Sequence, residues 1–508
     1  MLLVTALLAA ACGKKPPEPG SVKDEALLAG RDAKSFPAAD EDYFKAMDGA
    51  VALTSEEVKG RNNWIVWSGG NDRFWDYLIS KSFGVVDLLK IISSHPKVPH
   101  LTRDKRWEYL GVVNEPCFEK PKGPNADRFG LWLDTRSKDC PADPFENEQK
   151  YPGVKIGARG KNLPVGSYYG YATGVLGLRL FPNPAFDEAA AKKWDAERFY
   201  TDPKYYNDKN LVRPYRVGMS CGFCHVGPSP VKPPEDPENP KWENINSNPG
   251  SQYFWVDRVL FWEKDQANFI YQLIHTSLPG TLDTSFVSTD YINNPRTMNA
   301  VYNVGARLKI AERWGEEKLA GGGVNNKQFQ HYKQTAVLPQ YYKEPDKVWT
   351  AHVLKDGADS VGILGALNRV YINIGLFSEE WLLHFNALVG GQKVTPIQIA
   401  DANKNSSYWN ATQEQTPDVA LFFLKSAKPD LLKDAPGGEK FLSKDKATLQ
   451  RGKVVFAENC ARCHSSKIPD APAGVDDKNW DQYWAWSKTD DFKKKMTEKV
   501  LADDFLAD

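Results

Sequence analysis

The chain has 508 residues, of which 41% are hydrophobic and 26% charged. This length exceeds one ordinary core and predicts about two to four globular folding units. Lysine plus arginine and aspartate plus glutamate number 65 each, and this balance argues against a nucleic-acid-binding or polybasic membrane surface.

The chain begins with an apolar run, Leu2 to Ala11, that ends in small residues. The run is too short to span a bilayer as a helix and predicts the apolar core and cleavage site of a signal peptide. "LLAAAC" is also similar to a bacterial lipoprotein signal over residues 1–12, with Cys12 as the lipidated residue. Ala9 departs from that pattern, which usually has leucine there, and no basic residue precedes the run. We expect export, to the periplasm or as an outer-membrane-anchored lipoprotein of a Gram-negative bacterium.

Residues 13–39 are rich in proline, glycine, alanine and charge, which is typical of a flexible tether. Residues 40–210 are expected to form an N-terminal, mostly helical region. The helical spacing there is carried by Trp75, Leu78, Phe83, Val86 and Leu89.

Cys117 and Cys140 lie in a polar segment rich in proline and glycine within this region. In an exported protein, this setting predicts a disulfide that closes a loop. The alternative is two free buried thiols, for which the segment is too polar.

The sequence "CGFCH" at 221–225 is the first candidate cofactor-binding motif of the chain. Cys-x-x-Cys-His is the attachment pattern of c-type haem: Cys221 and Cys224 would form thioethers with the two vinyl groups, and His225 would ligate the iron as the proximal ligand. We expect residues 211–440 to form the first haem region.

Two other interpretations of the motif are weaker. A thioredoxin-like pair would follow a strand and open a helix, whereas prolines between Pro228 and Pro240 forbid a helix there. A zinc site would need further ligands, and no additional cysteine or close pair of histidines accompanies the motif.

The same pattern recurs as "CARCH", with Cys460, Cys463 and His464 in the same order. Two matches in one exported chain predict two covalently bound c-type haems. Residues 441–508 are expected to form a second cytochrome c domain. Its first helix should start near Ser443, with one face marked by Leu449, Lys453 and Phe456.

The sixth ligand of either iron has four candidates, each of which also suits a core position. They are His275, Met298, His384 and Met496.

Arginines near the motifs are candidates to pair with haem propionates, although each also suits a surface charge. They are Arg213, Arg216, Arg258, Arg296 and Arg307. Four tryptophans are candidate electron relays, with core packing as the alternative: Trp255, Trp262, Trp381 and Trp409.

The chain resembles the bacterial di-haem cytochrome c peroxidase superfamily, most of all its rubber-oxygenase-like branch. The resemblance rests on both motifs, on their long spacing, and on the stretches "PRTMNAVYNVGARL" and "YWNATQEQTPDVALFFLKSAKP". The resemblance covers roughly 217–469. It implies a mainly α fold of cytochrome c-like helical haem domains with long irregular loops and large insertions. Gly452 and Phe456 are similar to the glycine and aromatic of the first cytochrome c helix, which pack on a later helix. Family members continue further beyond the second motif, so we expect the chain to be truncated.

The resemblance implies an exported oxidoreductase in which one haem transfers electrons and the other reacts with peroxide or dioxygen. If dioxygen is the oxidant, the substrate is expected to be an apolar organic compound. The alternative is a non-enzymatic electron-transfer cytochrome with both haems six-coordinate. A third interpretation is a surface lipoprotein whose N-terminal region binds a partner. The expected partners are a small cytochrome or cupredoxin as redox partner and, through a lipid anchor, the membrane; no nucleic acid is expected.

Overall fold

The computed structural model describes residues 21–81, 86–247, 253–263, 316–318, 342–343, 347–349, 403–426, 430–461, 469–475 and 480–502. The chain divides into two compact units, Met1–Pro429 and Asp430–Asp508. The sequence predicts this boundary at 440/441. The units part earlier because the short helices at 432–434 and 438–441 pack on each other within the second unit.

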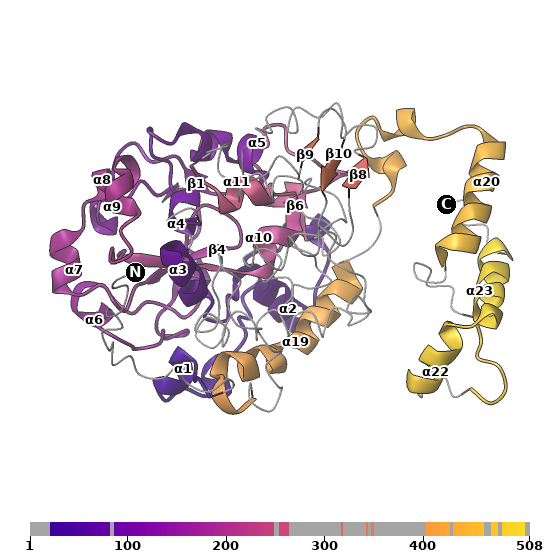
Figure 1. Cartoon of the computed structure of the whole chain (residues 1–508), viewed down its shortest axis with the longest axis horizontal. Helices are drawn as coiled ribbons and strands as arrows, with labels where there is room; N and C mark the ends of the chain where they lie inside the picture. Colours follow the sequence, from indigo (N-terminus) through magenta and orange to yellow (C-terminus); the bar gives the residue numbers. More distant parts are fainter. Residues whose placement is uncertain are drawn as a thin grey trace, which may run out of the picture. The chain divides into compact units, whose positions relative to one another are not determined.

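Helices are more extensive than strands in the described chain, as the mainly α prediction expected. The longest in the first unit are α2 (Ser55–Val66), α3 (Asp72–Lys81) and α19 (Ser407–Ser426) (Figure 1). The other described α-helices of this unit are α1 (Glu25–Leu28), α4 (Leu88–Ile91), α5 (Arg106–Leu110), α6 (Arg159–Asn162), α7 (Glu188–Lys193), α8 (Ala196–Thr201), α9 (Pro203–Tyr206), α10 (Cys221–His225) and α11 (Val256–Leu260).

Single 3-10 turns connect these helices, and much of 40–210 is turn and irregular chain. The turns are η1 (Ala33–Ser35), η2 (Asp48–Ala50), η3 (Pro99–Leu101), η4 (Arg103–Lys105), η5 (Ala126–Arg128), η6 (Pro144–Glu146) and η7 (Trp242–Asn244).

Four small antiparallel sheets complete the described part of this unit. They are β1 (Phe118–Glu119) with β2 (Thr135–Arg136); β3 (Tyr171–Ala172), β4 (Leu178–Pro182) and β5 (Tyr215–Met219); β6 (Val226–Pro228) with β7 (Ile245–Ser247); and β8 (Glu316–Lys318), β10 (Lys347–Trp349) and β9 (Tyr342–Lys343). In the three-stranded sheet that contains β4, that strand is buried along its whole length, and Leu178 pairs with Met219.

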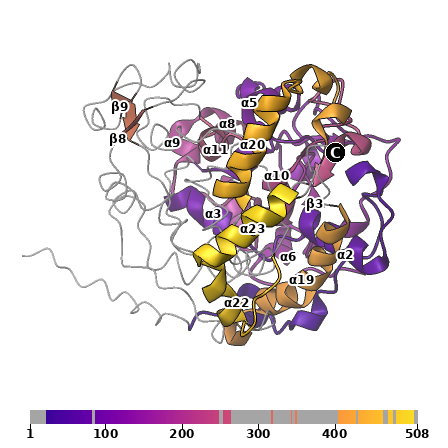
Figure 2. The same ribbon diagram turned by 90° about the vertical axis from the view of Figure 1, so that its right-hand side faces the viewer.

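Helices α2 and α19 lie side by side, although they are far apart in sequence (Figure 1; Figure 2). A capping box starts α2: Thr54 accepts from the backbone of Glu57, whose carboxylate accepts from the backbone of Thr54. Gly60 lets the helices approach, because a β-carbon there would lie 2.0 Å from the carbonyl oxygen of Asp418. The indole of Trp67 donates to the Thr412 hydroxyl at 2.9 Å.

Two apolar clusters fill the described part of the first unit. The first apolar cluster joins α3, α4, β4 and β5 and includes Phe74, Leu89, Ile91, Leu178 and Val217. The second apolar cluster joins α2, α19 and the segment around 168 and includes Phe36, Ile65, Trp67, Tyr169 and Phe422. The short turn α10 lies where these clusters meet, since Phe223 packs in the first and Val226 in the second.

The second unit contains η11 (Leu432–Asp434), η12 (Gly438–Phe441), α20 (Lys446–Asn459), α22 (Trp480–Ser487) and α23 (Asp490–Ala502) (Figure 2). Its core is small and is built from Ala457, Ala461, Trp486, Phe492, Met496 and Val500. Helix α20 packs against α23, and the Thr497 hydroxyl donates to the Ala457 carbonyl at 3.0 Å. Within the described residues of both units, no helix combines the length and the apolar character that crossing a membrane requires.

Candidate functional site

The first Cys-x-x-Cys-His motif forms the single helical turn α10, between strands β5 and β6. Cys221 and Cys224 are three positions apart in this turn, and such positions share one face of a helix. His225 is the last residue of the turn and lies next to Cys224 in sequence. Neither cysteine is joined in a disulfide. The motif therefore presents two thiols on one side of a helical turn, with an imidazole beside them.

Contacts from α2 fix the position of this turn. The Ser220 hydroxyl, just before the turn, donates to the Ile65 carbonyl at 2.6 Å. A β-carbon at Gly222 would lie 3.2 Å from both the Ile65 α-carbon and the Trp64 carbonyl oxygen. Glycine therefore lets the motif pack directly on the end of α2.

His225 is buried, with 8% of its surface exposed. Its ring centroid lies 5.7 Å from that of Trp64, at an interplanar angle of 41°. Trp64 in turn makes an edge contact with Phe423 of α19 at 4.6 Å. The imidazole thus lies in an aromatic environment made by α2 and α19, which excludes water from one side of the ring.

The two thiols face different surroundings. Cys224 is partly buried against the first apolar cluster, whereas Cys221 packs against the second apolar cluster. Burial, and to a smaller extent the neighbouring Cys221 sulfur, raises the pKa of the Cys224 thiol well above its usual range. Cys224 is therefore a neutral thiol, unlike the low-pKa attacking cysteine of a thioredoxin-like pair.

One feature of the thioredoxin-like alternative is nevertheless present. The strand β5 ends directly before α10. The sequence does not predict this strand. The helix ends after five residues, because Val226 begins β6. Residues 229–240, which contain the prolines, form no helix, as their composition predicted.

The proline-rich segment after the motif is tied to the rest of the unit at Glu238. Its carboxylate accepts from the backbone nitrogens of Trp107 at 2.8 Å and Glu108 at 2.9 Å, at the start of α5. Asn114 donates to the same carboxylate at 3.1 Å and to the Glu238 carbonyl at 2.8 Å. These bonds hold a loop that lacks regular structure in one conformation.

Three of the arginines proposed for haem propionates bind groups of the protein instead. Arg213 pairs with Asp87 at 3.1 Å, and Arg216 pairs with Glu25 at 3.2 Å; both arginines are buried. Arg258 donates to the Tyr109 carbonyl at 2.7 Å. Buried ion pairs commit the guanidinium groups of Arg213 and Arg216 to internal carboxylates. Arg296 and Arg307 lie outside the described residues.

Three of the four tryptophans proposed as electron relays lie in the described residues, and each packs on or binds another part of the protein. Trp262 packs on Tyr206 at 5.1 Å, Trp255 lies 4.1 Å from the Arg258 guanidinium, and Trp409 donates to the Asn403 side chain at 2.6 Å. Trp381 lies outside the described residues. The aromatic that does adjoin the motif, Trp64, was missed. Trp64 reaches the motif because α2 packs on α10, and no spacing pattern in the sequence indicates that contact.

The second motif is described only in part. Helix α20 starts at Lys446 behind the cap Asp445, close to the predicted start, and Cys460 is exposed at its end. Cys463 and His464 lie outside the described residues. Among the described residues, no atom lies within 4 Å of a β-carbon placed at Gly452, so this part of the chain shows no close helix contact there of the kind that the family resemblance implies.

Among the distal-ligand candidates, Met496 is buried in the core of the second unit, with 1% exposed. His275, Met298 and His384 lie outside the described residues, as does the lipidation candidate Cys12. In the part of the chain that is described, no group of three or more His, Cys, Asp or Glu side chains is placed to hold a metal ion.

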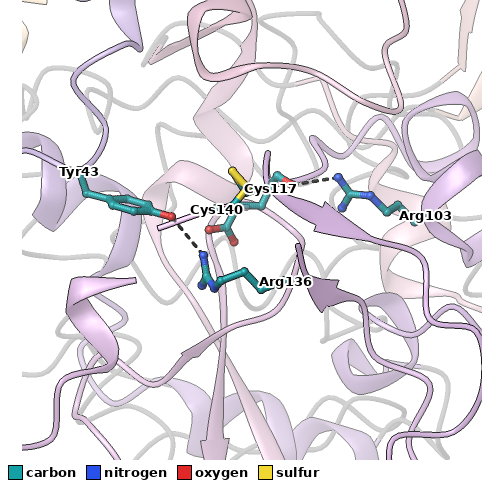
Figure 3. Close-up of a disulfide and its surroundings, with 6 residues drawn as sticks. Tyr43, Arg103, Cys117, Arg136 and Cys140 are labelled. Atoms are coloured by element: carbon teal, nitrogen blue, oxygen red, sulfur yellow. Dashed lines mark hydrogen bonds between the residues drawn. A yellow bond between two sulfur atoms is a disulfide. The ribbon is translucent and has the colours of Figure 1, made fainter. Parts of the chain in front are cut away.

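Cys117 and Cys140 form the disulfide expected from the sequence, with their α-carbons 5.6 Å apart. The bond fastens the hairpin of β1 and β2 (Figure 3). Arg136 on β2 donates to the Tyr43 hydroxyl at 3.1 Å beside it. Arg103 donates to the carbonyl of Glu115 at 2.9 Å on the other side.

Comparisons with protein-family models, with curated proteins and with solved structures found no match to this chain. The function therefore has to be argued from the site alone.

Proposed function

We propose that the chain is an exported di-haem c-type cytochrome that acts as an oxidoreductase. One haem would be held by Cys221, Cys224 and His225, and the other by the second motif at 460–464. The observation that carries the proposal is the helical turn α10, because attachment of haem through two thioethers needs two thiols on one face and a histidine directly after them.

The donor set and its surroundings fit a haem. The turn lies between two apolar clusters, which suits a large and mostly apolar macrocycle. Neither cysteine of the motif is joined in a disulfide, so each thiol would be able to add across a vinyl group, its sulfur bonding to one vinyl carbon and its proton going to the other. Within the described residues, the motif does not belong to any group of three or more metal-binding side chains such as zinc requires. The bound haem would supply an iron that changes oxidation state.

The chain contributes position and environment. Ser220 and Gly222 hold the turn against α2, so that the two thiols and the imidazole keep a fixed spacing. Trp64 packs beside the His225 ring at a tilt of 41° and forms part of its buried surroundings. Exclusion of water around the histidine would raise the reduction potential of a bound haem, because a dry site disfavours the extra positive charge of the ferric state.

In the proposed reaction, the haems that the motifs at 221–225 and 460–464 would hold would supply two redox-active irons, one to pass on electrons from a small cytochrome or cupredoxin and the other to react with peroxide or dioxygen. This assignment requires an iron with a free sixth position. Carbon monoxide added to the reduced protein tests it: a shifted absorbance band supports the reaction, and an unchanged spectrum favours the electron-transfer cytochrome with both irons six-coordinate.

The attachment itself is tested by staining for haem after denaturing electrophoresis of the chain produced with a cytochrome c maturation system. Full-length protein should carry two haems, and the Cys221→Ser/Cys224→Ser variant should carry one. The matched control is Cys117→Ala/Cys140→Ala, which removes two cysteines outside the motifs and should retain both haems. Haem that stays attached after all four motif cysteines are replaced would refute the proposal.

A further inference from the structure

Helix α2 carries buried donors that bind nothing in the described part of the protein. Arg61 is 0% exposed and Trp64 is 4% exposed. Among the described residues, the Nε and Nη1 groups of Arg61 and the indole Nε1 of Trp64 have no hydrogen-bond partner. Leaving a buried donor unpaired is costly, and more so when the donor is charged. Two such residues on one helix therefore indicate a partner that binds there.

Trp64 adjoins the first motif, and Arg61 is linked to it through neighbouring residues. Trp64 contacts His225 directly, and Arg61 lies one helical turn earlier on α2. Arg61 is also linked to the strand after the motif. Asp48, which acts electrostatically on Arg61, accepts from the Ser247 backbone at 2.5 Å, and Ser247 pairs with Val226 next to His225.

The chemistry of these donors selects an acceptor with negative charge. Among the described residues, Arg61 uses Nη2 alone for a hydrogen bond, to the carboxylate of Asp42, whose side chain is about half exposed. The remaining guanidinium and indole N–H groups can only donate. The neighbouring Asn62 does not compete for the same ligand, since its amide donates to the carbonyls of Ala39 and Glu41.

We infer that Arg61 and Trp64 form a carboxylate-binding subsite beside α10, and that the carboxylate it receives is a propionate of the haem held at Cys221–His225. The identity of the ligand rests on the proposed function. The subsite itself rests on the unpaired donors, and a free carboxylate from solution has the same chemistry.

The first arm of the test uses the full-length chain with Cys460→Ser/Cys463→Ser, so that only the first motif carries haem. The reduction potential is measured against pH in this background and in Trp64→Phe and Arg61→Gln. Loss of a donor to a propionate should raise the pH of the propionate-linked step, by on the order of one unit for Arg61→Gln. Arg61→Lys keeps the charge and covers the case in which Arg61→Gln does not fold.

Trp67→Phe is the matched control, because Trp67 is buried on the same helix but already donates to Thr412. It should leave the pH-dependent step unchanged. An equal step in all of these variants, with haem attached, would overturn the propionate assignment while leaving the proposed function intact.

The second arm uses the haem-free Cys221→Ser/Cys224→Ser form of the same background, with nitrogen-15-labelled tryptophan, titrated with sodium acetate. A saturable shift of the Trp64 indole resonance, absent in Arg61→Gln, supports the carboxylate subsite even if no haem attaches and the proposed function fails. An acetate response without any propionate effect in the first arm identifies a free carboxylate as the ligand. No response in either arm overturns the inference.

Discussion

Gly177 packs its backbone directly on the backbone of Phe223, in the middle of the Cys221–His225 turn. A β-carbon at Gly177 would lie 2.1 Å from the Phe223 nitrogen, and Gly177 has a φ of 80°. The Gly177 carbonyl also accepts from the Ser220 nitrogen at 2.8 Å. The turn before β4 is thus one wall of the candidate haem site.

Replacement of this glycine should damage the site selectively. We expect Gly177→Ala to lower the free energy of unfolding by more than about 2 kcal/mol, because the left-handed backbone and the clash with Phe223 both oppose a side chain. Urea unfolding measures the change. Gly160→Ala is the control, since nothing lies within 4 Å of a β-carbon there. Equal unfolding midpoints for the two variants would contradict the contact.

Glu115 should make stability fall as pH rises. The residue is buried, and burial raises the pKa of its carboxyl to about 8. Between pH 4.5 and 8 the folded state then holds a proton that the unfolded state has released, so the free energy of unfolding decreases with pH, by at most about 1.4 kcal/mol per pH unit. Unfolding of Glu115→Gln, measured at pH 5, 6.5 and 8, should lack this decrease. The exposed Glu119→Gln should behave as the unmodified chain does, and a decrease retained in Glu115→Gln would refute the assignment.

Lys90 should have the opposite effect at higher pH. Its ammonium group lies about 4 Å from the rings of Phe199, Tyr206 and Trp262, and burial lowers its pKa to about 7. From pH 7 to 10.5 the unfolded state binds the proton and the folded state does not, so stability gains from Lys90 as pH rises. Thermal unfolding of Lys90→Met against pH should lose that gain. The exposed Lys97→Met is the control, and a pH profile of Lys90→Met that matches the control would contradict the prediction.

Loss of the disulfide should weaken the fold without affecting haem attachment. Cys117 and Cys140 are separated by 23 positions, and closing a loop of this size stabilises a protein by about 3 kcal/mol. We expect Cys117→Ala/Cys140→Ala to lower the urea midpoint accordingly while the haem stain is kept. An unchanged midpoint would show that the hairpin of β1 and β2 is held by its other contacts.

The sequence predicted those helices whose apolar residues share one face. Trp75 and Leu78 indicated the helix α3, in which Leu78 is buried. Strand β5 was missed because both its faces are buried, which removes the alternation of apolar and polar residues that reveals a strand. Arg216 within it reads as a surface charge in the sequence, yet it is buried against Glu25.

The motif of the candidate site was visible in the sequence, but its surroundings were not. Cys221, Cys224 and His225 are contiguous, so their spacing alone indicates the chemistry. Trp64 reaches His225 only because α2 docks on α10, a contact between segments far apart in sequence. Arg61 was hidden for a related reason: it is a charged residue on a buried helix face, where spacing rules expect apolar side chains.

The packing of Gly222 on the end of α2 bears on how the protein is made. A haem attached at this turn has to reach both thiols and the imidazole, whereas docking of α2 encloses the histidine. If haem is attached here as proposed, attachment and folding of this segment would compete in time, and haem would have to be added before α2 closes over the turn. Conditions that slow the docking of α2 should then raise the yield of haem-loaded protein, and rapid folding should produce a compact chain without haem at the first motif.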